Sequence, residues 1–104
     1  MTGSSCRFPS PDDRDCRLLR IEGRVQGVGL REACVQHAQA LGLTGHVRNG
    51  RDGSVEVLLQ GPAEAVARMQ AWLHAGPPLA KVERVTVSSV PVTLLDRFER
   101  RPSE

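Results

Sequence analysis

Polar and apolar residues alternate along residues 17–25, which predicts a β-strand with one buried face. From residue 30 to residue 41 the apolar period lengthens to that of a helix, with one face turned toward a core. Gly42 follows where glycine often ends a helix. The inward positions of the strand are Leu19, Ile21, Gly23 and Val25, and those of the helix are Leu30, Ala33, Cys34, Ala38 and Leu41.

Two short alternating runs follow, over residues 44–49 and 54–60. Each predicts a strand with valine or leucine facing inward. The sequence Asn-Gly-Arg-Asp-Gly between them favours a tight turn, because glycine and asparagine adopt turn conformations readily. We therefore expect a β-hairpin here.

A second helix and a fourth strand complete the pattern. Gly61-Pro62 opens the helix with proline at its first position, and Gly76-Pro77-Pro78 ends it. Residues 81–90 then alternate as a strand with Val85 and Val87 inward. The apolar stripe of the helix consists of Ala65, Val66, Met69, Trp72 and Leu73.

The order strand–helix–strand–strand–helix–strand predicts an α+β fold. Two helices on one face of a four-stranded antiparallel sheet bury every apolar face at once, which is the ferredoxin-like plait (βαββαβ). Residues 98–101 could add a short fifth strand. We assign residues 17–101 to one domain, residues 1–16 to a disordered tail rich in Ser, Pro, Gly and Asp, and residues 102–104 to the C-terminal end. Many unrelated functions use this fold, so it does not decide the function.

Composition narrows the function classes. A chain of 104 residues suits one domain, and a net charge of +2 is too small to indicate a nucleic-acid or membrane partner. Aromatic residues are scarce, so the core must be aliphatic and base-stacking strands are missing. Cys6, Cys16 and Cys34 are too few and too widely spaced for a disulfide scaffold. Residues 1–16 lack the apolar stretch of a secretory signal, so we do not expect one. We expect a cytoplasmic monomer.

Neither a metal ion nor a cofactor is expected. His37, His46 and His74 never occur at the spacing of metal ligands. Cys34 has no neighbouring Cys or His and falls on the apolar stripe of its helix, which favours a small buried hydrophobic residue over a catalytic thiol.

The candidate chemistry lies in the turn before the first helix, Gln26-Gly27-Val28-Gly29-Leu30-Arg31. Backbone N–H groups at a helix start lack intrahelical partners, and with the helix dipole they form an anion site. Arg31 adds a forked guanidinium that can hold a phosphate through two hydrogen bonds. Glu32 stands where a dinucleotide fingerprint needs its third glycine, so one phosphoryl group is expected rather than a nucleotide. Taken alone, this stretch favours the simpler interpretation, a tight strand–helix turn with a solvated arginine.

Longer segments resemble a known family. GRVQGVGLR at residues 23–31 is followed by LGLTGHVRN at 41–49, DGSVEV at 52–57 and GPP at 76–78. This order and spacing resembles the acylphosphatases, whose pattern is Gly-x-Val-Gln-Gly-Val-x-Phe-Arg, a helix, Gly-x-Val-x-Asn, then Asp-Gly-x-Val. The resemblance covers residues 17–101 and implies hydrolysis of small acyl phosphates to a carboxylate and inorganic phosphate.

By this resemblance, Arg31 is the phosphate-binding residue and Asn49 orients the attacking water. Asn49 shares its strand face with Val47, so it should point toward the helices. The substrate already carries a carboxylate leaving group, so the site needs only to neutralise phosphate charge and place one water in line. Arg31 would take the electrostatic role of a metal. The resemblance implies a backbone phosphate cradle formed by Gln26, Gly27, Val28, Gly29 and Leu30.

Three residues depart from the family pattern. Leu30 stands where the family has Phe, Glu32 where an aromatic residue is usual, and His46 where an aromatic residue commonly precedes Val-Arg-Asn. Glu32 would weaken anion binding if it pointed inward. These changes bear on efficiency and substrate preference rather than on the type of reaction.

Other functions remain to be weighed against hydrolysis. The first is a non-catalytic module of the same fold that binds a small anion or a protein. The second is an RNA-binding plait, against which the scarcity of aromatic residues argues. The third is a domain acting on carbamoyl phosphate within a larger maturation protein; a chain that ends at Glu104 without zinc-finger cysteines favours a free-standing enzyme.

Overall fold

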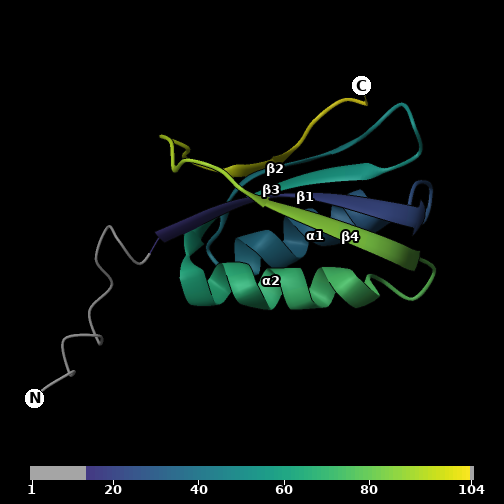
Figure 1. The fold of residues 1–104 in the computed structure, drawn as a ribbon, viewed down its shortest axis with the longest axis horizontal. Coiled ribbons are helices and arrows are strands. Elements are labelled where there is room, and N and C mark those ends of the chain that lie inside the picture. The colour runs from purple at the N-terminus through teal and green to yellow at the C-terminus, as the bar shows by residue number, and fades with distance from the viewer. Residues whose placement is uncertain (1–13, 104) are drawn as a thin grey trace, which may run out of the picture.

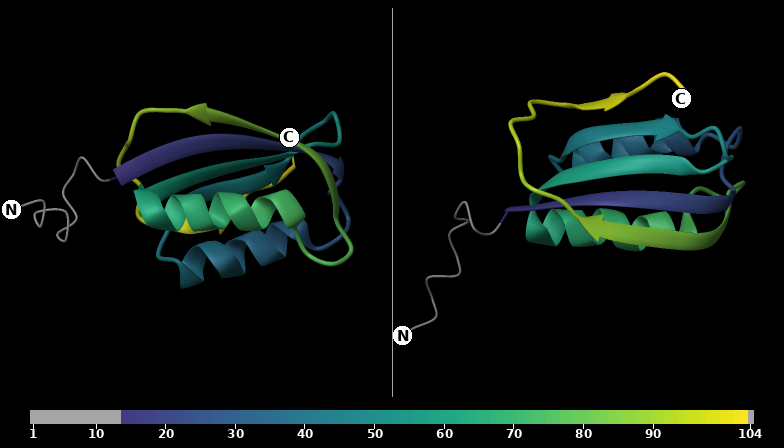
Figure 2. Two further views of the ribbon diagram at one scale, coloured as in Figure 1. Left: turned by 60° about the horizontal axis from the view of Figure 1, so that its bottom comes forward. Right: turned by 45° about the horizontal axis from the view of Figure 1, so that its top comes forward.

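The computed structural model of this chain describes residues 14–103. Five strands form one sheet in the order β4-β1-β3-β2-β5, and both helices lie side by side on one face of it (Figures 1 and 2). The predicted ferredoxin-like α+β fold is confirmed. The elements are β1 (Arg14–Arg24), α1 (Leu30–Ala40), β2 (Thr44–Asn49), β3 (Val55–Pro62), α2 (Ala63–Ala75), β4 (Lys81–Ser89) and β5 (Phe98–Arg100).

The short fifth strand makes the sheet mixed. β1, β2, β3 and β4 pair antiparallel, whereas β5 pairs parallel with β2. Because β4 and β5 occupy opposite edges, residues 90–97 pass around one end of the sheet between them (Figure 2, right). The buried side chain of Gln60 fixes this crossing, since its Nε2 donates to the Thr93 carbonyl at 2.6 Å and its Oε1 accepts from the Thr93 amide at 2.9 Å.

Two element boundaries differ from those expected by more than one residue. β1 begins at Arg14 rather than Arg17, so residues 14–16, assigned above to the tail, pair with Pro62, Gly61 and Gln60 of β3. This pairing also carries β3 on to Pro62, which becomes the N-cap of α2 instead of its first helical residue. Backbone pairing needs no apolar side chains, so the alternation pattern could not reveal it. The rest of the predicted tail, residues 1–13, lies outside the described residues.

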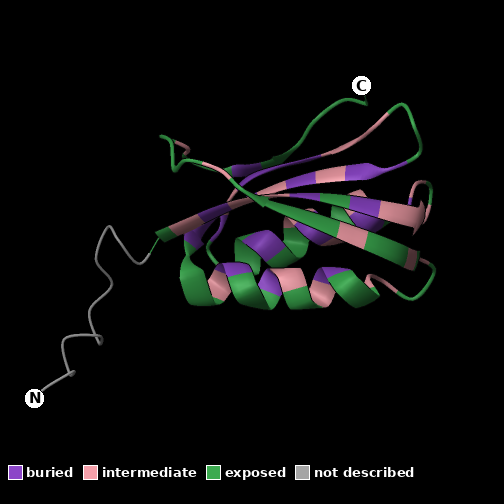
Figure 3. Ribbon diagram, viewed as in Figure 1, coloured by how far each residue is buried: buried purple, intermediate pink, exposed green. Residues whose placement is uncertain are grey.

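The core lies between the sheet and the two helices (Figure 3) and is aliphatic, as predicted. Each fully buried Leu or Ile contributes about 1.5–3 kcal/mol relative to an exposed one. Val87 pairs with the buried Leu19 and so lies on the inward face as predicted. It is nevertheless 38% exposed, because β4 is an edge strand with a neighbour on one side only. The completely buried members include Leu19, Ile21, Val47, Val57, Leu59, Val66, Met69 and Leu73.

Cys34 is a buried member of this core. It has no exposed surface, and burial raises the pKa of its thiol to about 12. The neutral thiol therefore packs as a small hydrophobic side chain, in agreement with the sequence-based expectation. In the described part of the chain, neither helix is long and apolar enough to cross a membrane.

Candidate active site

A small pocket separates the turn after β1 from the end of β2. Its volume is about 90 Å³. It brings together the predicted pair, Arg31 and Asn49, with three of the five predicted cradle residues. The lining residues are Val25, Gly27, Gly29, Leu30, Arg31, Glu32, Asn49 and Arg100.

The turn owes its shape to two glycines in the left-handed conformation. Gly27 has φ +74°, and Gly29, the N-cap of α1, has φ +82°. A residue with a side chain would raise the energy of this conformation by roughly 1–2 kcal/mol. A Cβ atom at either position would meet nothing within 4 Å, so conformation rather than space requires glycine here.

The backbone amides of this turn are available to a ligand. Within residues 14–103, no N–H group from residue 26 to residue 32 donates to a protein acceptor. The first hydrogen bond of α1 runs from the Ala33 amide to the Gly29 carbonyl at 3.1 Å. These open donors and the positive end of the helix dipole are the groups that an anionic ligand would need here.

Arg31 and Asn49 are also open toward the pocket. Among the described residues, the Arg31 guanidinium has no ion-pair or hydrogen-bond partner. The Asn49 Oδ1 atom is buried, and it is the only buried side-chain polar atom in that part of the chain without a partner. A buried unsatisfied acceptor costs about 1–3 kcal/mol, so it marks a place where a ligand or water donates a hydrogen bond.

The Gln26 side chain holds the turn against the β2–β3 hairpin. Its Nε2 donates to the carbonyls of Gly50 and Ser54, each at 2.8 Å. The side chain therefore points toward the hairpin, and only the backbone of Gln26 can belong to the predicted cradle. Sequence reasoning missed this role, because no spacing signal links a turn to a hairpin 24 residues away.

The hairpin that Gln26 contacts is itself ordered. The Asp52 carboxylate accepts from the Ser54 hydroxyl at 2.6 Å and from the Ser54 amide at 3.0 Å. These hydrogen bonds, with a smaller contribution from Arg20, lower the pKa of Asp52. Asn49 is the last residue of β2 before this turn. Its position is therefore restricted by the pairing of β2 with β3 and by the hydrogen bonds of the turn.

Comparison with known proteins decides between the functions left open. The acylphosphatase family model matches residues 18–99. Acylphosphatase 1 of Ralstonia nicotianae is 53% identical over 89 residues, which cover 84% of this chain and 87% of that protein. The structure of an acylphosphatase from Coxiella burnetii superposes with a TM-score of 0.83 at 33% identity, covering 86% of this chain and 95% of that one. The chain belongs to the acylphosphatase family.

As an acylphosphatase, the protein hydrolyses small acyl phosphates. The resemblance noted from the sequence is confirmed over nearly the same residues. The same fold occurs within a larger protein, since full-length HypF, in a phosphate- and nucleotide-bound structure, matches with a TM-score of 0.81 at 25% identity. That match covers 86% of this chain but only 12% of the HypF chain. The acylphosphatases of Ralstonia nicotianae and Coxiella burnetii, in contrast, are matched over 87% and 95% of their length.

The structure shows where the three residues that depart from the acylphosphatase pattern lie. Leu30 is buried and still packs in the core. His46 lies away from the pocket, where its Nε2 pairs with Glu56 Oε2 at 2.9 Å. Glu32 lines the pocket, but its Oε1 faces Arg100 Nη1 at 3.7 Å. Arg100 was not predicted, because nothing in the sequence reveals the parallel pairing that brings β5 beside β2.

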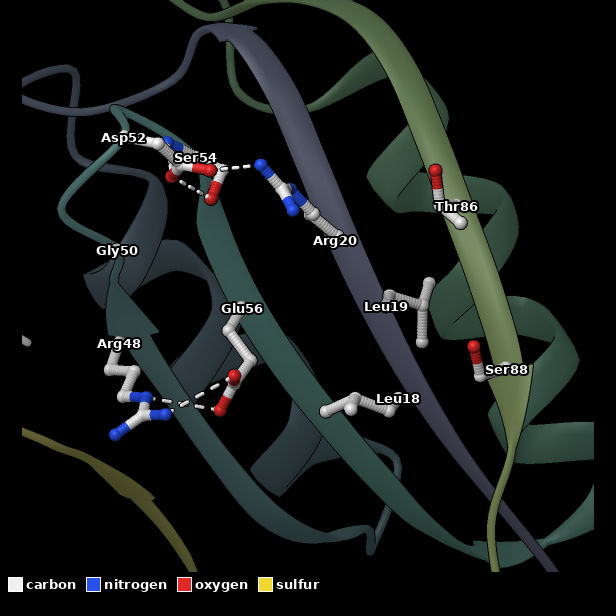
Figure 4. Close-up of a pocket in the computed structure, with 10 residues that line it drawn as sticks. All are labelled: Leu18, Leu19, Arg20, Arg48, Gly50, Asp52, Ser54, Glu56, Thr86 and Ser88. Carbon is white, nitrogen blue, oxygen red and sulfur yellow. Dashed lines mark hydrogen bonds and ion pairs between the residues drawn. The ribbon is translucent and has the colours of Figure 1, made fainter.

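A second, larger hollow lies on the sheet face opposite the helices (Figure 4), and we call it the outer groove. Its volume is about 370 Å³. Its charged groups pair with each other: Arg20 with Asp52, and Arg48 Nε with Glu56 Oε2 at 3.0 Å. Residues lining it are Leu18, Leu19, Arg20, Arg48, Gly50, Asp52, Ser54, Glu56, Thr86 and Ser88.

Proposed function

We propose that this acylphosphatase binds the phosphoryl group of its substrate between the turn of residues 26–30 and Arg31, and that Asn49 orients the attacking water. One observation carries the proposal. The open Arg31 guanidinium, the open amides of the turn and the unsatisfied Asn49 Oδ1 all belong to one small pocket.

Binding rests on charge-assisted hydrogen bonds. Each is worth about 1.5–3 kcal/mol net, so Arg31 and several amides together supply the binding energy for a phosphoryl group. Because these donors are already in place, they stabilise charge on the phosphoryl oxygens without reorganising. In this proposal Arg31 provides the charge that a metal ion would otherwise provide, so hydrolysis proceeds without metal or cofactor.

The chemical step needs one positioned water. The Asn49 Oδ1 accepts a hydrogen bond from that water, which directs an oxygen lone pair at phosphorus. The new P–O bond forms as the bond between phosphorus and the acyl oxygen breaks, and the electron pair leaves on the carboxylate. The proton of the water passes to a phosphoryl oxygen, so the products are a carboxylate and inorganic phosphate.

A benzoyl phosphate assay in excess chelator tests these roles. We expect Arg31→Gln to raise KM and lower kcat, because the guanidinium contacts the phosphoryl group in both the bound and the transition states. Asn49→Ala should lower kcat with little change in KM, because it acts on water. Unchanged kinetics in Arg31→Gln, or loss of wild-type activity in chelator, would contradict the proposal.

We further propose that the enzyme acts as a cytoplasmic monomer. One chain supplies every residue of the pocket, so the site needs no second copy. Cys16 and Cys34 are free thiols, which suits a reducing compartment. Sedimentation equilibrium at assay concentrations tests the first statement, and fractionation of the native cells tests the second.

A further inference from the structure

The rim of the phosphate pocket carries a second guanidinium. Arg100 lies on β5 opposite Val47 of β2, on the same strand face as the buried Phe98. That face is turned toward the helices, and the Arg100 side chain accordingly lines the pocket of Arg31 and Asn49. The side chain is 53% exposed, so it stands at the mouth rather than the floor.

The pocket is too small to enclose a whole substrate. Its volume of about 90 Å³ is far below the roughly 300–1,000 Å³ of pockets that enclose drug-sized ligands. With the phosphoryl group inside, the acyl group must extend out past the rim. The exposed charged residues there, Glu32 and Arg100, are therefore positioned to contact the acyl group.

The pairing at the rim leaves Arg100 able to bind a second anion. Its Nη1 lies 3.7 Å from Glu32 Oε1, and both side chains are more than half exposed, so this ion pair is weak. Across the part of the chain that the structure describes, Arg100 has no other ion pair or side-chain hydrogen bond. Its remaining N–H donors can take a carboxylate through two hydrogen bonds.

We propose that Arg100 is a specificity-determining residue that favours acyl phosphates with a second anionic group on the acyl part, and that Glu32 moderates this preference. The inference rests on the proposed function, because it takes the phosphoryl group to be held by Arg31. A neutral acyl group gains nothing from Arg100, whereas a carboxylate on the acyl group gains an ion pair. Removing Glu32 would free Arg100 for that pair.

Two rigid substrates test the proposal: benzoyl phosphate and 4-carboxybenzoyl phosphate. The para carboxylate cannot reach its own acyl phosphate, so it does not add an intramolecular reaction. Selectivity is kcat/KM for the carboxylated substrate divided by that for the neutral one, and comparing it between variants cancels intrinsic reactivity. We expect Arg100→Gln to lower selectivity about three- to fivefold, because only the carboxylated substrate loses an ion pair.

Further variants separate this role from structural effects. Glu32→Gln should raise selectivity about twofold, and Arg100→Lys should retain most of it because the charge remains. The matched control is Arg101→Gln, which removes the same charge one residue along. The Arg101 side chain pairs with Glu99 at 3.3 Å and does not line the pocket, so selectivity should stay at the wild-type value. In wild type, high salt should reduce selectivity, because exposed charges are screened.

Three results would overturn the inference. Equal losses for both substrates in Arg100→Gln would mean that Arg100 acts on the phosphoryl group or on folding. Equal loss of selectivity in Arg101→Gln would mean that only net charge matters. Wild-type selectivity that is insensitive to salt would exclude an ion pair at the rim. In each case, loss of both activities in Arg31→Gln would leave the proposed function standing, whereas full activity in Arg31→Gln would remove the basis of both.

Discussion

The outer groove and the pocket at the start of α1 differ in a way that their volumes do not describe. The outer groove, about 370 Å³, is the larger, yet its arginines face carboxylates that already neutralise them (Figure 4). The pocket at the start of α1, about 90 Å³, contains an arginine and an amide oxygen with no partner among the described residues. Unsatisfied polar groups are therefore the better guide to a candidate site in this fold. A group that is already paired must break a hydrogen bond or an ion pair before it can bind a substrate, whereas an unpaired group need not.

The largest expected difference is in kcat/KM, between a variant that lacks an arginine of the pocket and a variant that lacks an arginine of the outer groove. Arg31→Gln should lower kcat/KM for benzoyl phosphate roughly 10²–10⁴-fold, which corresponds to the loss of two charge-assisted hydrogen bonds. Arg20→Gln, at the outer groove, should leave kcat/KM within about twofold, because an exposed ion pair contributes little. Steady-state kinetics on the two variants checks this, and similar losses in both would break the comparison.

The unsatisfied oxygen of Asn49 predicts an opposite response of activity and stability. Asn49→Ala should lower kcat about 10²–10³-fold, the effect typical of losing a positioned polar group at a reacting centre. Its unfolding free energy should fall little or even rise, because the variant removes a buried acceptor without a partner. Urea unfolding alongside kinetics measures both.

Ser54→Ala is the corresponding change at the outer groove. It removes a hydroxyl that donates to Asp52, so it should cost about 1 kcal/mol of stability and leave kcat nearly unchanged. If Asn49→Ala proved the more destabilising of the two, the distinction between satisfied and unsatisfied groups would not hold.

Substitution of Gln26 should have an effect of intermediate size, on both stability and phosphate binding, because this side chain joins the turn at the pocket to the hairpin. Gln26→Ala removes two hydrogen bonds, although the Gly50 and Ser54 carbonyls each keep a backbone donor, in the Gly53 and Gly50 amides. At about 0.5–1.5 kcal/mol for each lost hydrogen bond, the change should cost about 1–3 kcal/mol of stability. It should also weaken competitive inhibition by inorganic phosphate, since the cradle loses its support. Gln26→Glu, which keeps the size but loses the donors, should behave alike; retention of wild-type inhibition in both variants would contradict the supporting role.

The smallest effect concerns acid stability at the outer groove. Burial opposes ionisation of Glu56, but hydrogen bonds from His46 and Arg48 outweigh it and lower the pKa of this carboxyl. A carboxyl whose pKa is lower in the folded state stabilises the protein at pH values above its unfolded-state pKa. This stabilisation is lost as the pH falls through the folded-state pKa. Wild type should therefore exceed Glu56→Gln in stability near neutral pH, with the difference shrinking below about pH 4.5. A difference that stays constant from pH 7 to pH 3 would argue against this linkage.

The sequence predicted the parts of this structure that depend on local patterns. Alternation at Leu19 and Ile21, the helical period from Leu30 and the glycine-spaced turn are each short-range signals. The core and the position of the turn follow from them. Asn49 was placed on the helix side by strand parity alone. The catalytic roles of Arg31 and Asn49 came from the family resemblance and stay predictions until the variants are measured.

Features that depend on pairing between residues far apart in the sequence could not be predicted from local patterns. The parallel register of β5 positions Arg100, and the contact of β1 with the end of β3 determines where the first strand begins. The effect of Glu32 was left open because its direction depends on Arg100. Likewise, the edge position of β4 leaves Val87 exposed although its alternation predicts an inward face.

The double hydrogen bond of Gln26 has a mechanical consequence. A single carboxamide ties two separate loops together, so a thermal displacement of one carries the other with it. The proposed phosphate-binding turn and the hairpin that follows Asn49 should therefore keep their relative position as this end of the molecule fluctuates. A small enzyme can in this way keep the turn before α1 and the β2–β3 hairpin aligned without enclosing them in a rigid cleft.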